Sequence, residues 1–290
     1  MKSNVFGRGF TDMVDPRSFM AFRIFPRFND TQLGVATAFL YENDQRTFLV
    51  TNWHNVTGRR PDTHEVIHTK AAIPNNFLAG LHCMTLGSDG KVDSGIVTIN
   101  LPLYFDAEMM QPTWLEHPLL GCRVDVVAIE IHEGRMTGNY PGWNSLVRVS
   151  RGETDLRASI GSDAYILGFP RGIGGGDFPI WKRGSIATEA YTEIDGLPKL
   201  YVDTATKEGM SGAPVFLASN GFVHREDPSI RAIANGIVHR FIGVYSGRVG
   251  DSALEAQLGI VWKESALMDI LESGVPGSPS IQLSRKSQDS

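Results

Sequence analysis

A serine flanked by glycines is the residue of this sequence best suited to nucleophilic chemistry. Ser211 lies in the segment Gly209–Val215, with Gly209 two positions before it and Gly212 directly after it. A serine hydroxyl becomes a strong nucleophile only when a base takes its proton and donors stabilise the resulting oxyanion. Glycine permits a tight turn that points backbone N–H groups at one spot, so those of Gly209 and Ser211 are the candidate oxyanion donors. The same residues also fit an ordinary turn before a strand.

Two further polar residues could complete such a site. His54 follows the apolar run Leu49–Trp53, where a strand end would hold an imidazole as a general base or as a structural residue. A carboxylate would orient the imidazole and offset its charge. Asp125 opens the apolar segment Asp125–Ile129 and is favoured, because a buried carboxylate without a partner is costly. Asp93, which precedes a Ser-Gly pair, is the alternative.

Short strands are the elements expected to position these residues. Apolar runs recur along the chain and are separated by glycine, proline and polar turns. The runs 33–41 and 47–53 surround the polar stretch 42–46, which predicts a β-hairpin. One helix is expected over Ser265–Leu271, with Ser265 as N-cap and Gly274 ending it. Further strands are expected at 124–131, 164–169, 200–203, 213–217 and 241–246.

Length and composition set the class of protein. The chain has 290 residues, a net charge of −5, 42% hydrophobic and 20% charged residues, which are ordinary values for a globular protein. Many short strands in so long a chain predict an all-β protein that divides into two units. We expect an N-terminal unit at 16–135, a C-terminal unit at 150–273 and a flexible tail at 274–290.

Charge and hydropathy argue against several kinds of partner. The negative net charge gives no reason to expect nucleic acid. No apolar run approaches the roughly 20 residues that span a bilayer, and the N-terminus has no signal-peptide core, so we expect a cytoplasmic protein without a membrane partner. Only two cysteines, Cys83 and Cys122, are present, which excludes a disulfide scaffold. The sequence leaves the oligomeric state open.

A zinc site is the rival chemistry. Residues His64–His68 carry two histidines four positions apart, with a glutamate between them, as in zinc peptidases. That motif needs a helix, but Pro61 and Pro74 bound this segment, and the β-branched Val66 and Ile67 lie inside it. We therefore expect no metal and no cofactor, and keep a zinc peptidase through His64 and His68 as a minor alternative.

Three segments together resemble the chymotrypsin-like (trypsin-like) serine proteases, above all their cysteine-poor bacterial branch. His54, Asp125 and Ser211 follow one another in the order of that family. The resemblance covers roughly residues 34–271. It is carried by Thr51–Val56, similar to a Thr-Ala-Ala-His block, by Asp125–Ile129, similar to an Asp-Leu-Ala-Leu block, and by Gly209–Val215, similar to a Gly-x-Ser-Gly-x-Pro block.

This resemblance implies a fold and an activity. The fold is two six-stranded antiparallel Greek-key β-barrels with a short C-terminal helix, and the activity is that of a serine endopeptidase working through an acyl-enzyme. Ser211 would be the nucleophile, His54 the base and Asp125 the orienting acid, with the N–H groups of Gly209 and Ser211 as oxyanion hole. Peptide or protein substrate would contact Ala205, Thr206, Tyr245, Ser246 and Gly247. The alternative is a catalytically silent relative that binds peptides in the same groove.

Departures from the family pattern qualify this interpretation. Met210 replaces the aspartate that receives a freed N-terminus in secreted zymogens, so activation by propeptide cleavage is not expected. His54 and Asp125 lie 71 positions apart, more than usual, so residues 57–114 must hold an insertion, which keeps Asp93 as a candidate acid.

The expected specificity pocket also departs from the trypsin pattern. Residues 205–207 supply no acid for a basic substrate side chain, which argues against a preference for Lys or Arg. Arg248, near the same pocket, favours acidic or polar side chains instead.

Overall fold

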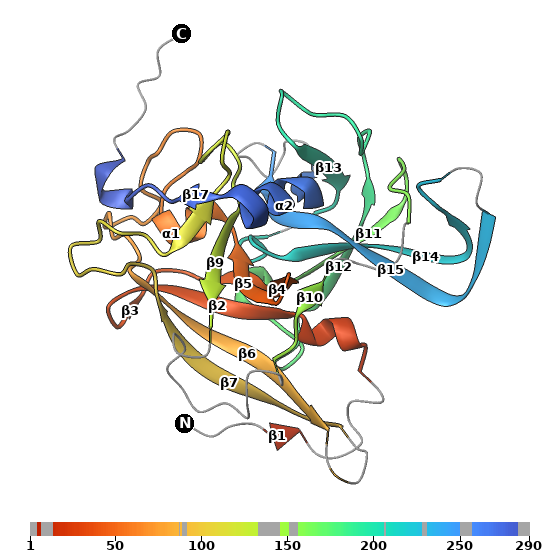
Figure 1. Cartoon of the computed structure of the whole chain (residues 1–290), viewed down its shortest axis with the longest axis horizontal. Coiled ribbons are helices and arrows are strands. Elements are labelled where there is room, and N and C mark those ends of the chain that lie inside the picture. The colour runs from red at the N-terminus through yellow and green to blue at the C-terminus, as the bar shows by residue number, and fades with distance from the viewer. Residues whose placement is uncertain are drawn as a thin grey trace.

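Two β-sheet units make up the protein, one built mainly from the first half of the chain and one from the second (Figure 1). The computed structural model describes residues 5–6, 14–86, 88, 92–132, 146–150, 156–205, 207–227, 231–249 and 257–283. The described residues contain two α-helices, so the all-β expectation is confirmed. In Figure 1 most of the first unit runs from red to yellow, with β10 in green and β17 in blue, and the second unit runs from green to blue.

The first unit is an eleven-stranded sheet with the expected hairpin at its centre. Strands β4 (Ala36–Asn43) and β5 (Arg46–Thr51) pair antiparallel, and β4 is buried from residue 36 to residue 41 because both of its faces are covered. Along the sheet the order is β1 (Val5–Phe6), β7 (Val92–Pro102), β6 (Asn76–Leu86), β2 (Ala21–Phe28), β4, β5, β9 (Val127–Ile131), β8 (Trp114–Glu116) and β17 (Val275–Pro276), with β3 (Thr31–Gln32) on β2 and β10 (Val149–Ser150) on β4.

The second unit is a closed barrel of six strands, as expected. It is closed by β11 pairing with both β12 and β14, so its strands have no free edge along most of their length. The barrel order is β11 (Asp163–Gly168), β12 (Ile180–Ile186), β13 (Lys199–Asp203), β16 (Leu258–Lys263), β15 (Arg231–Arg248) and β14 (Pro214–His224). In Figure 1 the β14–β15 hairpin projects to the right beyond the barrel.

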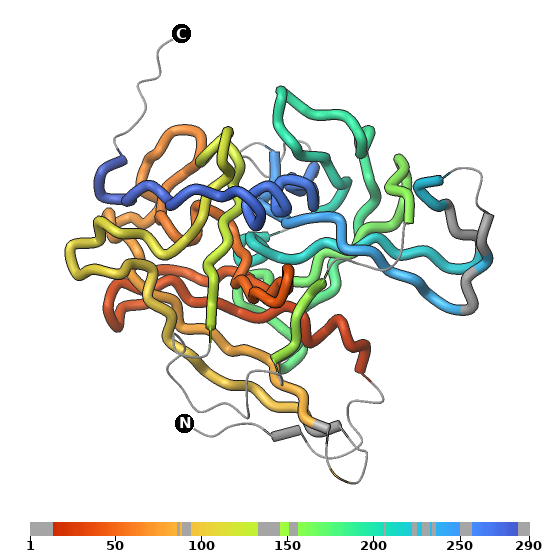
Figure 2. The backbone as a smooth tube through the Cα atoms, viewed as in Figure 1, coloured from red at the N-terminus to blue at the C-terminus, as the bar shows by residue number. Residues whose placement is uncertain are grey.

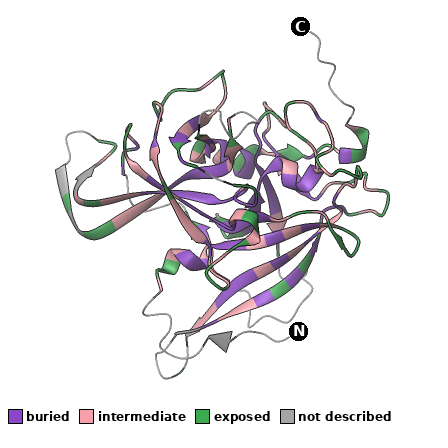
Figure 3. Cartoon of the chain, turned by 180° about the vertical axis from the view of Figure 1, so that it is seen from behind, coloured by how far each residue is buried: buried purple, intermediate pink, exposed green. Residues whose placement is uncertain are grey.

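An aromatic cluster joins the two units. Phe241 of β15 lies with its ring centroid 5.5 Å from Phe39 and 5.6 Å from Tyr41, both on β4. All three side chains are at most 2% exposed. Figure 3 shows the resulting band of buried residues running through the centre of the molecule. Because large aromatic side chains dominate the energetics of such contacts, this cluster fixes the two sheets against each other.

The C-terminal helix covers part of this junction. Helix α2 (Glu264–Ser273) buries Ala266, Leu267, Ile270 and Leu271, which lie on one helical face. The expected helix is confirmed and ends at Gly274, but its N-cap is Lys263 and not Ser265. The helix begins earlier because strand β16 runs directly into it. Within the described ranges, neither helix has the length and apolarity needed to cross a membrane.

The segment after α2 packs on the first unit, which corrects part of the expected tail. Strand β17 pairs with β8, and the Ser280 hydroxyl donates to the Thr57 carbonyl at 2.6 Å. Arg59 donates through Nε to the Ser280 carbonyl at 2.9 Å. Figure 2 shows this dark blue segment running along the first unit. Residues 274–283 are therefore part of the first sheet's packing, while 284–290 lie outside the described residues.

Other pairings refine the expected organisation. Six strands, from β7 through β6, β2, β4 and β5 to β9, form the middle of the first sheet. The short strand β1 pairs with β7 at one end of this series, and β8 followed by β17 extends it beyond β9 at the other end. Strand β10, at 149–150, pairs with β4 of the first unit, so the chain crosses to the second unit only after it. Cys83 and Cys122 are not joined by a disulfide.

We predict that His82 makes the protein sensitive to acid. Burial among aromatic rings lowers the pKa of His82 to about 4, against the opposing effect of Asp177. The ring stacks on Phe178 with centroids 5.6 Å apart and meets the edge of Phe19. Unfolding exposes an imidazole of pKa near 6.5, so the unfolded chain binds the extra proton first and stability falls from about pH 6.5 down to about pH 4.

A His82→Phe variant tests this. The free energy of unfolding from urea titrations should fall between pH 7 and pH 4.5 by on the order of 2–3 kcal/mol more in the unaltered protein than in the variant. Phenylalanine keeps the ring contacts but does not titrate. An equal fall in both proteins would show that His82 is not the group responsible.

Candidate active site

His54 lies on a short helix that begins where strand β5 ends. Helix α1 (Trp53–Thr57) is closed by Gly58 in the left-handed region, at φ 65°. Its start is anchored by Asn52, whose buried side chain donates through Nδ2 to the Asp125 carbonyl at 2.6 Å. Trp53 is fully buried and donates through Nε1 to Glu116 at 2.9 Å. These contacts fix the two residues directly before His54, whose own side chain is 18% exposed.

Asp125 is in direct contact with His54 through both carboxylate oxygens. Oδ1 accepts from the His54 backbone N–H at 2.9 Å, and Oδ2 lies 2.7 Å from Nδ1. An ionised carboxylate only accepts, so Nδ1 carries a proton, and in the neutral imidazole Nε2 then keeps its lone pair. The Asp125 side chain is 5% exposed, so the carboxylate is shielded from water. This tautomer is the one that a general base needs.

The second unit supplies a third donor to the same carboxylate. The Ser246 hydroxyl of β15 donates to Asp125 Oδ2 at 2.8 Å. Ser246 was expected to contact substrate, but its hydroxyl is directed to the acid and thereby links the two sheets. With three donors, the buried charge of Asp125 is well satisfied.

The turn that carries Ser211 depends on its two glycines. Gly209 has φ +92°, and a Cβ there would lie 2.3 Å from the Phe169 carbonyl oxygen. Gly212 has φ +86°, and a Cβ there would lie 2.1 Å from the Thr37 carbonyl oxygen. Both positions therefore exclude any side chain on grounds of space as well as backbone conformation. The turn is also tied down by the Arg171 N–H, which donates to the Glu208 carbonyl at 2.6 Å.

Buried polar contacts hold this turn against the first unit. The Thr37 N–H donates to the Ser211 carbonyl at 2.9 Å, and the Thr37 hydroxyl donates to the Gly209 carbonyl at 2.7 Å. Asn55, the residue after His54, donates through Nδ2 to the Ser211 carbonyl at 3.4 Å and to the Thr51 hydroxyl at 2.9 Å. The helix with the imidazole and the turn with the hydroxyl are thus neighbours.

Strand β15 also hydrogen-bonds to the turn that carries Ser211. The Gly212 N–H donates to the Tyr245 carbonyl, and the Tyr245 N–H donates to the Ala213 carbonyl, both at 2.8 Å. The turn of Ser211 is therefore bonded to the residue directly before Ser246. Among the described contacts there is no hydrogen bond from the His54 ring to the Ser211 hydroxyl, so their proximity rests on backbone and Asn55 contacts. Such bonds often tighten only when substrate binds.

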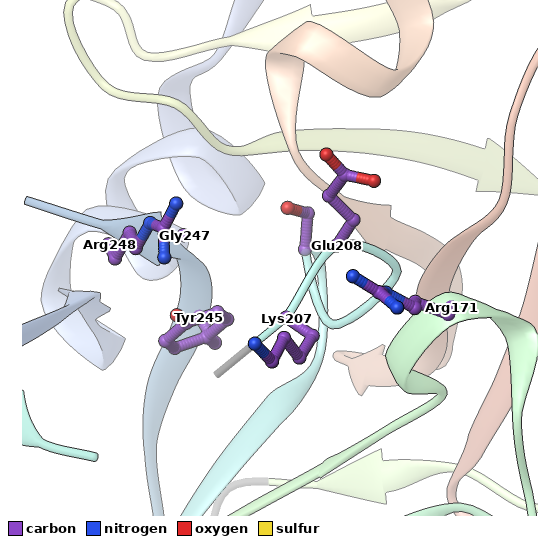
Figure 4. Close-up of a pocket in the computed structure, with 7 residues that line it drawn as sticks. Arg171, Lys207, Glu208, Tyr245, Gly247 and Arg248 are labelled. Carbon is purple, nitrogen blue, oxygen red and sulfur yellow. The ribbon is translucent and has the colours of Figure 1, made fainter. Parts of the chain in front are cut away.

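A cavity of about 310 Å³ opens beside Ser211. Figure 4 shows Lys207 and Tyr245 between Arg248 on one side and Arg171 on the other. The lining residues are Arg171, Lys207, Glu208, Ser211, Tyr245, Gly247 and Arg248.

The cavity includes some of the expected substrate residues but not all. Tyr245 and Gly247 line it, whereas Ser246 and Ala205 do not, and Ala205 is exposed elsewhere on the same segment. Thr206 lies outside the described residues.

Met210 lies buried beside the nucleophile turn. It is 1% exposed and belongs to an apolar cluster with Ala213 and Ile166. A Cβ on Gly168 would come within 3.0 Å of its sulfur atom. This environment offers a freed N-terminus no charged partner at position 210.

The residues of the alternative sites, His64 and His68 for zinc and Asp93 for the acid, do not lie in the arrangement that those sites would need. Residues 61–63 and 69–70 form turns and Val66 bridges to Arg59, so His64 and His68 do not share a helical face. The described residues hold no cluster of three or more His, Cys, Asp and Glu side chains suited to a metal ion. Asp93 lies on β7 opposite Thr85, whereas it is Asp125 that contacts His54.

The closed barrel, the eleven-stranded sheet and the C-terminal helix confirm the expected β architecture, and the His54–Asp125 pair lies where the two sheets meet. A closed six-stranded barrel followed by a C-terminal helix is what the resemblance to the chymotrypsin-like proteases implies, whereas the first unit is an eleven-stranded sheet and not a second six-stranded barrel. No protein-family model matches the sequence, and a search of curated proteins finds no match either.

Solved structures similar to this one are proteases. The active form of the Rv3671c protease from M. tuberculosis has a TM-score of 0.44 and 16% identity, over 91% of this chain and 85% of that one. The serine endoprotease from Yersinia pestis has a TM-score of 0.44 and 10% identity, over 89% of this chain and 66% of that one. At these TM-scores and identities, conclusions about this chain rest on its own contacts.

Four residues of the site carried no clear signal in the sequence. Thr37, Asn55 and Arg171 contact the nucleophile turn, and Glu116 holds Trp53. Asn55 adjoins His54 and could have been noticed for that reason. The other three come close to the site only through pairing of distant strands and loops.

We predict that Gly212→Ala strongly destabilises the fold. A methyl group there would overlap the Thr37 carbonyl, adding about 1–3 kcal/mol to the roughly 1–2 kcal/mol cost of a left-handed alanine. Gly176→Ala is the matched control, because Gly176 has φ +71° and nothing lies within 4 Å of the place that its added methyl group would take. Urea unfolding of both variants measures the difference, and equal losses of stability would contradict this account of the junction.

Proposed function

We propose that the protein is a serine endopeptidase that hydrolyses peptide bonds with Ser211, His54 and Asp125. The observation that carries the proposal is the buried Asp125 carboxylate, which accepts from the backbone N–H and Nδ1 of His54 and from the hydroxyl of Ser246. The contact with Asp125 fixes the tautomer of His54, and no described residue hydrogen-bonds to Nε2. That arrangement prepares a base beside the serine turn.

The reaction begins with the Ser211 hydroxyl. His54 Nε2 accepts its proton while Oγ bonds to the carbonyl carbon of the substrate, which becomes tetrahedral with a negative oxygen. The N–H groups of Gly209 and Ser211 are the donors assigned to that oxygen. His54 then gives the proton to the leaving amine, the C–N bond breaks and an acyl-enzyme remains. His54 then takes a proton from water, whose oxygen bonds to the acyl carbon. The ester C–O bond breaks, the acid leaves, and His54 returns the proton to Ser211 Oγ.

Asp125 acts through His54 and not on the substrate. Its negative charge offsets the imidazolium that forms when the proton arrives, and its two contacts with His54 keep Nε2 directed away from the carboxylate. Ser246 holds this carboxylate from the other sheet. Neither a metal nor a cofactor has a role in the proposed reaction.

We predict that a fluorophosphonate probe labels Ser211 covalently. The hydroxyl oxygen would bond to phosphorus as fluoride leaves, which requires the activated serine. Labelling should disappear in Ser211→Ala and persist in Ser185→Ala, which changes a serine of strand β12. Mass spectrometry of the labelled peptide identifies the site. No labelling of the unaltered protein at neutral pH would favour the alternative, a catalytically silent protein that binds peptides.

We also predict that Asp125→Asn lowers kcat for casein hydrolysis by about 10⁴-fold. The amide can donate to Nδ1, which moves the imidazole proton to Nε2 and removes the base. Asp93→Asn is the matched control and should leave kcat within about threefold of its original value, since Asp93 lies on β7, away from the His54–Asp125 pair. Thermal melts show whether both variants are folded. A larger loss in the Asp93 variant would reassign the acid.

A further inference from the structure

The cavity beside Ser211 is unusually rich in cationic side chains. Arg171, Lys207 and Arg248 line it, against one carboxylate, that of Glu208. All four residues are exposed, so solvent and a ligand in the cavity can reach their side chains. The net charge of the lining is positive although that of the chain is −5. A local field of this kind attracts an anionic group.

The cavity adjoins the proposed nucleophile. Ser211 is part of the lining, and one wall is the segment directly before the turn, with Lys207 and Glu208. The opposite wall is β15, with Tyr245 and Arg248. A substrate carbonyl carbon bonded to Ser211 would therefore lie at this cavity, and the side chain of the same residue can extend between the two walls.

A β-bulge explains how Arg248 comes to line the cavity with Tyr245. Residues three apart in a regular strand face opposite sides of the sheet. Here Tyr245 pairs with Val261 and Gly247 with Ile260, so Ser246 is an extra residue. The bulge lets Ser246 reach Asp125 while Tyr245 and Arg248 share one side.

The partner strand leaves room for this arrangement. Arg248 pairs with Gly259, which has no side chain to occupy the space. A Cβ there would lie 2.6 Å from Cε2 of Tyr245, so the buried tyrosine ring packs directly on Gly259. The ring forms an apolar wall along which the methylene groups of an acidic side chain can pack, with the cations around it (Figure 4).

We propose that this cavity selects substrates with glutamate or aspartate immediately before the cleaved bond. The inference rests on the proposed peptidase function and adds its substrate class. Lys207 and Arg248 bind the substrate carboxylate, and Arg171 adds to the field from the far side. Glu208 opposes them, so its removal should strengthen the preference. A basic substrate side chain would meet three like charges here.

Four acetylated peptide p-nitroanilides that differ only in the residue before the cleaved bond (Glu, Gln, Leu or Lys) test the proposal. At low salt, kcat/KM for the Glu substrate should exceed that for the Gln substrate by about tenfold, and the ratio should shrink as salt is added because exposed charges are screened. The Gln substrate is isosteric, so the ratio isolates the charge. A best substrate with Leu or Lys, or a Glu/Gln ratio near one, overturns the proposal.

Variants that remove a charge from the cavity lining should change the Glu/Gln ratio of kcat/KM in opposite directions, according to the sign of the charge removed. Lys207→Gln and Arg248→Gln should each lower the Glu/Gln ratio about threefold or more, whereas Glu208→Gln should raise it. Arg46→Gln, the matched control, removes the same charge from β5 of the first unit and should leave the ratio unchanged. A ratio that is the same in all four variants contradicts the assignment. Because unfolding cannot raise a ratio, the Glu208 variant keeps the test decisive.

Failure of the acidic specificity is distinguishable from failure of the peptidase function. If the fluorophosphonate labels Ser211 but the enzyme prefers Leu or Lys, the acidic specificity is wrong and the peptidase function stands. If Ser211 is not labelled and none of the four peptides is cleaved, the peptidase function fails and the specificity fails with it.

Discussion

The buried carboxylate of Asp125 is the interaction on which the site depends. It is held by two groups of His54 from the first unit and by Ser246 from the second. An isolated carboxylate at this depth would be strongly unfavourable, so folding is coupled to bringing these donors together. The same contacts that satisfy the charge also set the tautomer of the imidazole. Stability and catalytic geometry are thus two consequences of one buried charge, and both require the two sheets to be docked.

Docking is maintained by contacts of different kinds on either side of that carboxylate. The aromatic cluster around Phe241 supplies apolar area between the sheets. The Thr37 and Asn55 contacts supply direction, because each hydrogen bond is satisfied at only one alignment of the Ser211 turn. Gly212 permits this alignment by letting the turn approach the Thr37 carbonyl. Apolar packing alone would tolerate small shifts between the units. The hydrogen bonds of Thr37 and Asn55, and the close contact of Gly212 with the Thr37 carbonyl, do not tolerate such shifts.

Local pattern was enough to predict the hairpin of β4 and β5, most of the barrel strands and the C-terminal helix, since each depends on neighbours in sequence. The pairing of Asp125 with His54 followed from the argument that a buried acid needs a partner. Contacts between distant segments were out of reach. Ser246 lies 121 positions from Asp125, and no pattern distinguishes its hydroxyl from that of any other strand serine. The position of 274–283 on the first sheet was missed because its Pro, Gly and Ser content is typical of a mobile tail.

The bulge at Ser246 links the catalytic and specificity functions more closely than either the sequence or the fold class indicates. One extra residue in β15 turns a hydroxyl toward Asp125 and places Arg248 on the side of Tyr245. A regular strand could not do both, because its side chains alternate between the two faces and those of Tyr245 and Arg248 would then lie on opposite faces. A deletion that restored regular pairing would therefore disturb the acid and the cavity together. This coupling gives a reason for the irregular pairing of β15 with β16, in a barrel where β11, β12, β13 and β16 pair with one another in regular register.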